Sequence, residues 1–250
     1  MIRRSRVVIV ICPSLEETVR QIEPTAQVVL IENAPGSAED QATASDAAAV
    51  RSGFGLDPST PVVLYTGTFE VYQGLDLLFA AMAVVRAQRP DARLLLAGGK
   101  VDQVAKARAE AKAAGIEDVA IFAGERPAAE IPAYLLACDA LVSPRSRGTN
   151  TPLKLYQYLR SGKPIVATRL LTHTQVLSDD TAILTGTSPR EFAEGIVAAL
   201  TDKVRAERVG RQARELAETK YSYQAYLERT RRACAALEHD ASLTAVKDVA

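Results

Sequence analysis

Residues that could bind an anion follow apolar segments with the character of β-strands. The apolar run Val62–Thr66 leads into Gly67, and a helix-like pattern begins near Gly74. At the carboxyl end of a parallel strand, a glycine lets backbone N–H groups approach a phosphate closely. Gly67 is therefore a candidate ligand contact, although a tight turn alone would also favour a glycine there.

A second segment of this kind follows the apolar run Ala140–Ser143. Thr151 is a favoured N-cap and Pro152 a favoured first helical residue, so we expect a helix from Pro152 to Ser161. A helix start offers unpaired N–H groups and the positive end of the dipole to an anion. This combination suits a diphosphate better than a neutral ligand. The candidate residues around this helix start are Arg145, Arg147, Thr149, Asn150, Thr151 and Lys154.

The same helix carries polar side chains at a helical spacing. Lys154, Gln157 and Tyr158 stand at positions i, i+3 and i+4, which share one helix face. A long cationic donor, an amide and a phenol together suit a phosphate, a ribose and a ring. The alternative is a solvated face on which the lysine stem covers apolar surface and its ammonium group reaches water.

A third polar segment, Thr172-His173-Thr174, follows the predicted strand Pro164–Ala167. The other histidine, His239, lies in a polar tail, and no carboxylate or second histidine stands at metal-ligand spacing from His173. The sequence therefore predicts no metal site. Two roles remain open for His173, namely contact with a ligand and packing of the loop.

Short apolar segments alternate with longer helical patterns along the whole chain. Near-continuous apolar strands separated by helices indicate a parallel sheet covered on both faces, so we predict an α/β fold of the Rossmann-like, doubly wound type. The predicted strands are Val7–Cys12, Val28–Glu32, Val62–Thr66, Arg93–Ala97, Ala120–Phe122, Ala140–Ser143, Pro164–Ala167 and Ala182–Leu184. The predicted helices include Gly74–Gln88, Val104–Ala114, Glu130–Cys138, Pro152–Ser161 and Glu191–Thr201, with a helical region Val204–Leu237 broken near Tyr221.

Composition divides the chain into four parts. Residues 36–58 lack a bulky apolar period over much of their length and are predicted to be a linker. Residues 59–220 hold a complete α/β pattern, and residues 221–250 form a helix and tail. Residues 1–35 hold two strands, which cannot bury both faces of a parallel sheet. We therefore expect them to be the remnant of a larger, N-terminal domain.

The overall composition is that of an ordinary globular protein with a real core. The chain has 250 residues, 48% of them hydrophobic, with 30 basic and 30 acidic residues. This charge balance argues against a nucleic-acid binder. The three cysteines are widely spaced and fit neither a disulfide framework nor a metal site. Without a signal peptide or an apolar run long enough to span a bilayer, a cytoplasmic protein is expected, with peripheral membrane contact left open.

The chain resembles the C-terminal domain of a glycosyltransferase of family 4, a retaining family with the two-domain GT-B fold. The likeness runs from Val7 to about Leu237. Val28–Gly36 resembles the interdomain strand of that family. The most specific likeness is the segment Pro152–Ala167 (PLKLYQYLRSGKPIVA), which is similar to the helix and strand that hold the donor nucleotide.

The resemblance implies one half of a GT-B architecture that binds a UDP- or GDP-sugar. The expected reaction transfers a hexose-type sugar to an acceptor hydroxyl on a glycan or lipid-linked molecule, without a metal ion or other cofactor. The residues that contact the acceptor would belong to the N-terminal domain. This chain alone is therefore expected to bind the donor and to transfer little sugar.

The sequence departs from the family pattern at charged positions. The family commonly has two glutamates here, and the resemblance places Thr149 and Gln157 at these positions. An arginine and a lysine of the first loop correspond to Thr68 and Gln73. Charge on the phosphates would then be met by Arg145, Arg147 and Lys154.

Two other functions remain open. A non-catalytic nucleotide-sugar-binding or partner module is favoured by the four lost charges. A sugar-nucleotide epimerase shares the GT-B architecture, but it needs acid and base carboxylates in the cleft, and the donor-helix segment has none.

Overall fold

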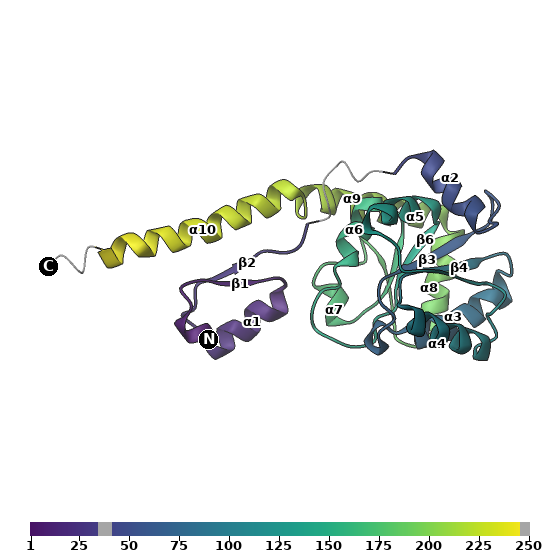
Figure 1. The fold of residues 1–250 in the computed structure, drawn as a ribbon, viewed down its shortest axis with the longest axis horizontal. Helices are drawn as coiled ribbons and strands as arrows, with labels where there is room; N and C mark the ends of the chain where they lie inside the picture. The colour runs from purple at the N-terminus through teal and green to yellow at the C-terminus, as the bar shows by residue number, and fades with distance from the viewer. Residues whose placement is uncertain (35–41, 246–250) are drawn as a thin grey trace.

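The computed structural model describes residues 1–34 and 42–245, with side chains described as far as residue 237. Its described strands form a two-stranded sheet, β1–β2, and a six-stranded sheet in the order β5-β4-β3-β6-β7-β8. All strand pairs are parallel. Helices cover both faces of the larger sheet (Figure 1). The predicted α/β, doubly wound fold is confirmed.

The strands of the larger sheet lie close to their predicted positions. They are β3 (Val62–Thr66), β4 (Arg93–Ala97), β5 (Ala120–Gly124), β6 (Ala140–Ser143), β7 (Ile165–Thr168) and β8 (Ile183–Thr185). Strand order changes direction at β3, which pairs with β4 on one side and β6 on the other. In open parallel sheets, ligands bind outside the carboxyl ends of the strands at such a switch point.

Each strand sends alternate side chains to opposite faces, so the sheet has two apolar cores. Val63 and Tyr65 of β3 join one buried cluster, and Val62 and Leu64 join the other. The first cluster is covered by α3 (Leu75–Gln88), α4 (Val101–Ala113) and α8 (Pro189–Thr201). The second is covered by α5 (Ile131–Ala137), α6 (Lys154–Ser161) and α9 (Lys203–Thr219).

The predicted linker contains a helix, α2 (Ala44–Gly53). Its Ala-rich sequence has no apolar period, but Thr43 and Asp46 form a reciprocal capping box that fixes the helix start. The Arg51 side chain donates a hydrogen bond to the Ala137 carbonyl oxygen of α5. This part of residues 36–58 is therefore folded onto the α/β domain, while residues 35–41 lie outside the described part of the chain.

The first segment forms a small unit of its own. A 3-10 helix (Ile2–Arg4) precedes β1 (Val8–Val10), α1 (Pro13–Ile22) and β2 (Val28–Leu30). This unit leaves large apolar side chains in solvent, with Ile9 56% and Ile22 43% exposed. Two three-residue strands and one helix bury little apolar surface. That this segment is the remnant of a larger domain stays a prediction.

Helix α10 (Tyr223–Ala245) returns from the α/β domain to the first unit. The predicted break near Tyr221 corresponds to the gap between Thr219, the end of α9, and Tyr223. Helix α10 contacts β2 and extends past it (Figure 1).

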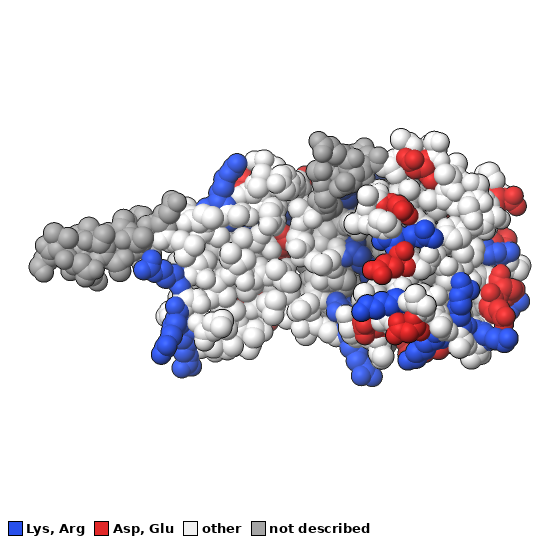
Figure 2. Space-filling model, viewed as in Figure 1, with Lys and Arg blue, Asp and Glu red and all other residues white. Residues whose placement is uncertain are grey.

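Surface features agree with the balanced composition. Figure 2 shows acidic and basic side chains interspersed over the α/β domain. Over the described part of the chain, none of the helices is both long and apolar enough to cross a membrane.

Candidate functional site

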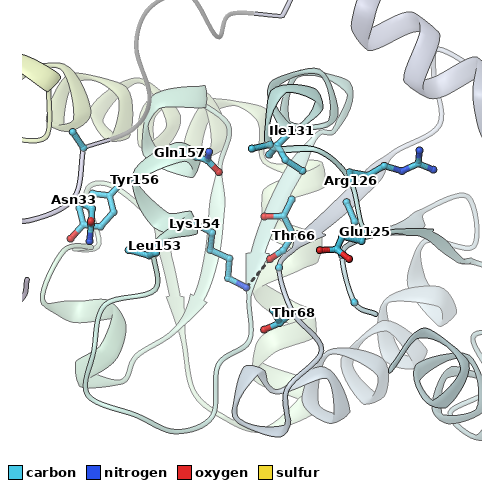
Figure 3. Close-up of a pocket in the computed structure, with 16 residues that line it drawn as sticks. Asn33, Thr66, Thr68, Glu125, Arg126, Ile131, Leu153, Lys154, Tyr156 and Gln157 are labelled. Atoms are coloured by element: carbon cyan, nitrogen blue, oxygen red, sulfur yellow. Dashed lines mark hydrogen bonds between the residues drawn. The ribbon is translucent and has the colours of Figure 1, made fainter. Parts of the chain in front are cut away.

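A cavity of about 460 Å³ opens at the carboxyl ends of β3, β4 and β5, next to the start of α6 (Figure 3). This volume lies within the usual range of small-molecule sites. Glycines, polar side chains and a few apolar groups line it: Asn33, Ala34, Thr66, Gly67, Thr68, Ala97, Gly98, Gly99, Glu125, Arg126, Ala128, Ile131, Leu153, Lys154, Tyr156 and Gln157.

Glycines allow the loops after β3 and β4 to approach each other closely. Gly67 and Gly98 both have positive φ, +126° and +136°. A Cβ atom on Gly98 would overlap the Gly67 carbonyl group, and one on Gly99 would overlap the ring of Phe69. Positions 98 and 99 therefore cannot carry a side chain without displacing the loop after β3.

Lys154 supplies a cation to the pocket from the first position of α6. Its Nζ atom donates a hydrogen bond of 3.1 Å to the Thr66 carbonyl oxygen and lies 3.9 Å from the ring centroid of Tyr65. Figure 3 shows the side chain reaching across the pocket toward Thr66. Burial lowers the pKa of the Lys154 ammonium group to about 7, and the charge of Arg145 acts in the same direction. An anion in the pocket would stabilise the protonated form.

Helix α6 begins at Lys154, two residues later than predicted. The Leu155 N–H is bonded to the Pro152 carbonyl oxygen at 3.1 Å, and the Tyr156 N–H to that of Leu153 at 3.2 Å. This tight entry makes Leu153 the N-cap, so Thr151 stands too early to cap the helix. The Thr151 hydroxyl is buried without a hydrogen-bond partner among the described residues. The predicted Thr151 cap is wrong.

The predicted polar face of α6 divides between the pocket and the core. Gln157 lines the pocket beside Lys154 (Figure 3). Tyr158 is fully buried, and its hydroxyl oxygen accepts a hydrogen bond of 2.9 Å from the Thr66 N–H. Its role is to hold the end of β3 against α6, not to contact a ligand.

Arg145 does not line the pocket and organises its own loop. Its guanidinium group donates to the Asn150 carbonyl oxygen (2.7 Å) and the Thr172 hydroxyl oxygen (3.1 Å), and it lies 4.9 Å from the ring centroid of Tyr72. Burial lowers the pKa of Arg145. Both hydrogen bonds come from Nη1, and Nε is buried without a partner among the described residues. Through these contacts Arg145 ties together the loops after β3, β6 and β7. Arg147, in the same loop, is exposed.

His173 is a buried packing residue. It lies in α7 (Leu171–Thr174), and its Nδ1 atom is 2.8 Å from the Thr168 carbonyl oxygen, which can only accept a hydrogen bond. Nδ1 therefore carries the proton, and Nε2 accepts one from the Ser143 hydroxyl at 2.9 Å. Burial lowers the pKa of His173 to about 4, so the ring is neutral at pH 7. Both ring nitrogens are occupied within the fold.

The structure brings together four of the thirteen predicted site residues, namely Gly67, Thr68, Lys154 and Gln157. The other nine do not line the pocket: Gln73, Arg145, Arg147, Thr149, Asn150, Thr151, Thr172, His173 and Thr174. Several of these belong to one loop network, in which Thr172 donates to the Asn150 carbonyl oxygen and Gln175 to that of Thr149. The backbone oxygens of this loop are thus bonded to α7 and its C-cap.

Sequence reasoning missed several pocket residues. Gly98-Gly99 and Glu125-Arg126 follow predicted strands, so their position after a strand was an available signal. Asn33 comes from the first unit, and its approach to α6 depends on the tertiary fold. The part of the chain with described side chains holds no group of three or more His, Cys, Asp or Glu side chains suited to a metal ion.

The parallel α/β arrangement is that of the Rossmann-like domains of GT-B glycosyltransferases. Residues 46–216 match the family described as "Glycosyl transferases group 1", which is more than half of the chain. The protein belongs to this family.

Relatives and solved structures agree with this assignment. The chain is 28% identical over 171 residues to the D-inositol 3-phosphate glycosyltransferase of Segniliparus rotundus (66% of this chain, 38% of the relative). It is 29% identical over 205 residues to the enzyme of that name in Corynebacterium glutamicum (79% and 47%). The fold superimposes on HepE of Anabaena in complex with UDP-glucose with a TM-score of 0.81, at 18% identity, covering 95% of this chain and 65% of that one. The chain thus spans less than half the length of these curated relatives.

Proposed function

We propose that the pocket binds the nucleotide-diphosphate part of a sugar donor, UDP- or GDP-linked, for a retaining hexosyl transfer of the family 4 type. The observation that carries this proposal is the placement of Lys154. Its ammonium group lies beside Gly67 at the carboxyl end of β3, in a pocket whose opposite wall is backbone. A buried cation beside glycine turns at the carboxyl ends of parallel strands suits a diphosphate.

Each pocket residue has a chemical role in this proposal. Lys154 stabilises the charge that develops on the leaving diphosphate. Gln157 donates to or accepts from a ribose hydroxyl, whereas a carboxylate would only accept and would add a negative charge. The acceptor hydroxyl attacks the anomeric carbon from the same face as the departing nucleotide diphosphate, whose bond to that carbon breaks and whose phosphate oxygen takes up the acceptor's proton, so the anomeric configuration is retained. No metal ion or other cofactor takes part.

The phosphate contacts differ from those expected from sequence. Arg145 is engaged in its own loop and Arg147 does not line the pocket, so Lys154 bears most of the charge. Arg126 is the other basic residue of the pocket lining, and its guanidinium group lies 3.9 Å from a Glu130 carboxylate oxygen. It is placed at the far end, where β5 ends, which suits the base or ribose end of a nucleotide.

The titles of the related proteins support a UDP-sugar as the first donor to test. HepE binds UDP and UDP-glucose in its solved complexes. The relatives named D-inositol 3-phosphate glycosyltransferase use a polar hydroxylated acceptor, and a glycan or lipid-linked acceptor fits the same reaction. Contacts to the acceptor would come from the part of the relatives' length that this chain does not span. We place the protein in the cytoplasm, with peripheral contact to the inner membrane face.

Isothermal titration of the full chain with UDP and with GDP tests donor binding. We expect saturable binding of one of the two nucleotides at a single site, with uridine or adenosine binding far more weakly because they lack the diphosphate. If neither diphosphate binds, the pocket is not a donor site.

A non-catalytic binding module is the second candidate. It is favoured by the absence of a carboxylate at Thr149 and Gln157, while the acidic residue that lines the pocket is Glu125, at the end of β5. Release of labelled sugar from the bound donor, in the presence of an acceptor and a partner chain that supplies the other domain, separates the two. Donor binding without any sugar release would favour the module.

A further inference from the structure

Glu32 is a buried carboxylate where three parts of the molecule meet. It follows β2 of the first unit, is 2% exposed, and its Oε1 atom has no hydrogen-bond partner among the described residues. The next two residues, Asn33 and Ala34, line the pocket. An isolated carboxylate in such a place is costly, so the residues that neutralise it determine whether this chain segment stays in position.

Two cations from the C-terminal region neutralise Glu32. Lys220 Nζ lies 3.8 Å from Oε1, and an Arg229 guanidinium nitrogen lies 3.8 Å from Oε2. Arg229 is 19% exposed in its side chain and also donates a hydrogen bond of 2.8 Å to the Lys220 carbonyl oxygen. Arg229 therefore links the Glu32 carboxylate to the segment between α9 and α10.

Two tyrosines connect this ion cluster to the pocket. The rings of Tyr156 and Tyr221 are 5.1 Å apart with edge-to-face geometry, and both are 1% exposed. Burial raises the pKa of both phenols, and the negative charge of Glu32 acts in the same direction. Tyr156 lines the pocket on the same side as Asn33 (Figure 3). Glu32 is thus linked to the pocket in two ways. It directly precedes Asn33 and Ala34 in the chain, and its charge acts on Tyr156, which lines the pocket.

We propose that Arg229, with Lys220, is a positioning residue for the donor site. By neutralising Glu32 it holds Asn33 and Ala34 against α6 and completes one wall of the nucleotide pocket, although α10 itself contributes no residue to the pocket lining. The inference rests on the proposed donor binding. It makes nucleotide affinity depend on a helix that no nucleotide touches.

The test is titration of the full chain and its variants with UDP. Arg229→Met keeps much of the side-chain stem and removes the charge, and Arg229→Lys restores the charge. Arg232→Met is the matched control, because Arg232 is an exposed arginine on the same helix. We expect Arg229→Met to weaken UDP binding about tenfold, Arg229→Lys to stay within about threefold of the wild type, and Arg232→Met to have no effect.

Two further measurements separate positioning from simple loss of structure. Amide hydrogen exchange at Asn33 should accelerate in Arg229→Met, while exchange in β3 and β4 stays unchanged. If Arg229→Met does not fold, the nearly isosteric Glu32→Gln carries the same expectation. A purely structural role would lower the melting temperature and leave UDP affinity unchanged well below it.

The outcomes distinguish the two proposals. If the wild type fails to bind UDP or GDP, the proposed function is overturned and this inference falls with it. If the wild type binds and Arg229→Met binds equally tightly, only the positioning role is overturned.

Discussion

The loops after β3, β4 and β5 leave a pocket open, whereas the loops after β6 and β7 fill the space between them with their own side chains. The open side combines glycines with the polar side chains of Thr68, Glu125 and Arg126. The filled side has Arg145 Nη1, Thr172 and His173, which are hydrogen-bonded within the fold, while Arg145 Nε is buried without a partner among the described residues. In sequence the two sides look similar, because both are polar loops after strands. In the structure, the polar groups of the filled side bond to each other, whereas those of the open side line a pocket.

This difference shows why residue type alone did not locate the site. A polar residue after a strand contacts a ligand only if the fold leaves its donors unoccupied. Lys154 remains available because its partners are a single carbonyl oxygen and a ring. In Arg145, Nη1 is already engaged by a carbonyl oxygen and a hydroxyl, the guanidinium group lies against the Tyr72 ring, and Nε is buried without a partner among the described residues.

The largest expected effect tests the open side. Gly98→Ala places a methyl group against the Gly67 carbonyl, whereas Gly115→Ala, also at positive φ, meets no atom within 4 Å. We expect Gly98→Ala to lower the free energy of unfolding by about 3 kcal/mol or more and Gly115→Ala by about 1 kcal/mol, as measured by urea denaturation. Equal losses in both variants would mean that close approach of the two loops is not required.

Removal of the pocket cation should affect binding and not folding. We expect Lys154→Ala to weaken nucleotide binding by about 1.5–3 kcal/mol, because a charge-assisted bond to phosphate is lost. Lys163→Ala, just beyond the other end of α6 and outside the pocket lining, is the control. Isothermal titration of both variants makes the comparison. Unchanged affinity in Lys154→Ala would assign this lysine to a packing role.

The filled side predicts a pH-dependent stability. The pKa of His173 is near 4 in the folded state and about 6.5 when unfolded, so its contribution is present above pH 6.5 and is lost as pH falls toward 4. The expected loss between pH 7 and pH 5 is about 2 kcal/mol. Urea denaturation of the wild type and His173→Gln at both values isolates this contribution. If the free energy of unfolding changes equally with pH in both proteins, the pKa of His173 is the same in the folded and unfolded states.

Nucleotide affinity should depend on pH through Lys154. Because the pKa of Lys154 is near 7, the free protein loses the ammonium charge as pH rises. In the complex, the bound phosphate keeps Lys154 protonated. We expect UDP affinity to fall about tenfold from pH 7 to pH 8.5, a range in which the terminal phosphate of UDP is already ionised. Lys154→Met should remove this dependence. If the UDP affinity of the wild type does not change with pH, protonation of Lys154 does not control binding.

The smallest expected effect is that of Arg147→Ala. Arg147 is exposed and outside the pocket lining, so its removal should change nucleotide affinity by less than about 0.5 kcal/mol. Titration with UDP at low salt is the most sensitive form of this measurement. A loss comparable to that of Lys154→Ala would move the diphosphate toward the loop after β6.

Much of the fold could be predicted from sequence, because buried parallel strands are apolar runs with few alternatives. The strands from Val62 to Thr185 lie within two residues of their predicted limits. Helix α2 was missed because its alanines have no apolar period, although Thr43 and Asp46 carried the capping signal. The start of α6 was misplaced because local preference favoured a Thr151 cap, and the tight turn at Pro152 overrode it.

The site was less predictable, because it depends on how the loops use their hydrogen bonds. Gly67, Lys154 and Gln157 were found by their place after strands and on a helix face. Asn33 could not be found, because residues 1–34 reach α6 only through the tertiary fold. Arg145 and His173 were predicted because of their chemistry. In the structure, Arg145 donates hydrogen bonds to Asn150 and Thr172, and His173 donates one to Thr168.

Amide hydrogen exchange of the full chain, with and without saturating UDP, tests the contrast between the two sides most directly. The account predicts slower exchange at residues 66–68, 97–99 and 153–157, with little change at residues 145–150 and 171–174. Protection confined to residues 145–150 and 171–174 would contradict it and place the nucleotide on the filled side.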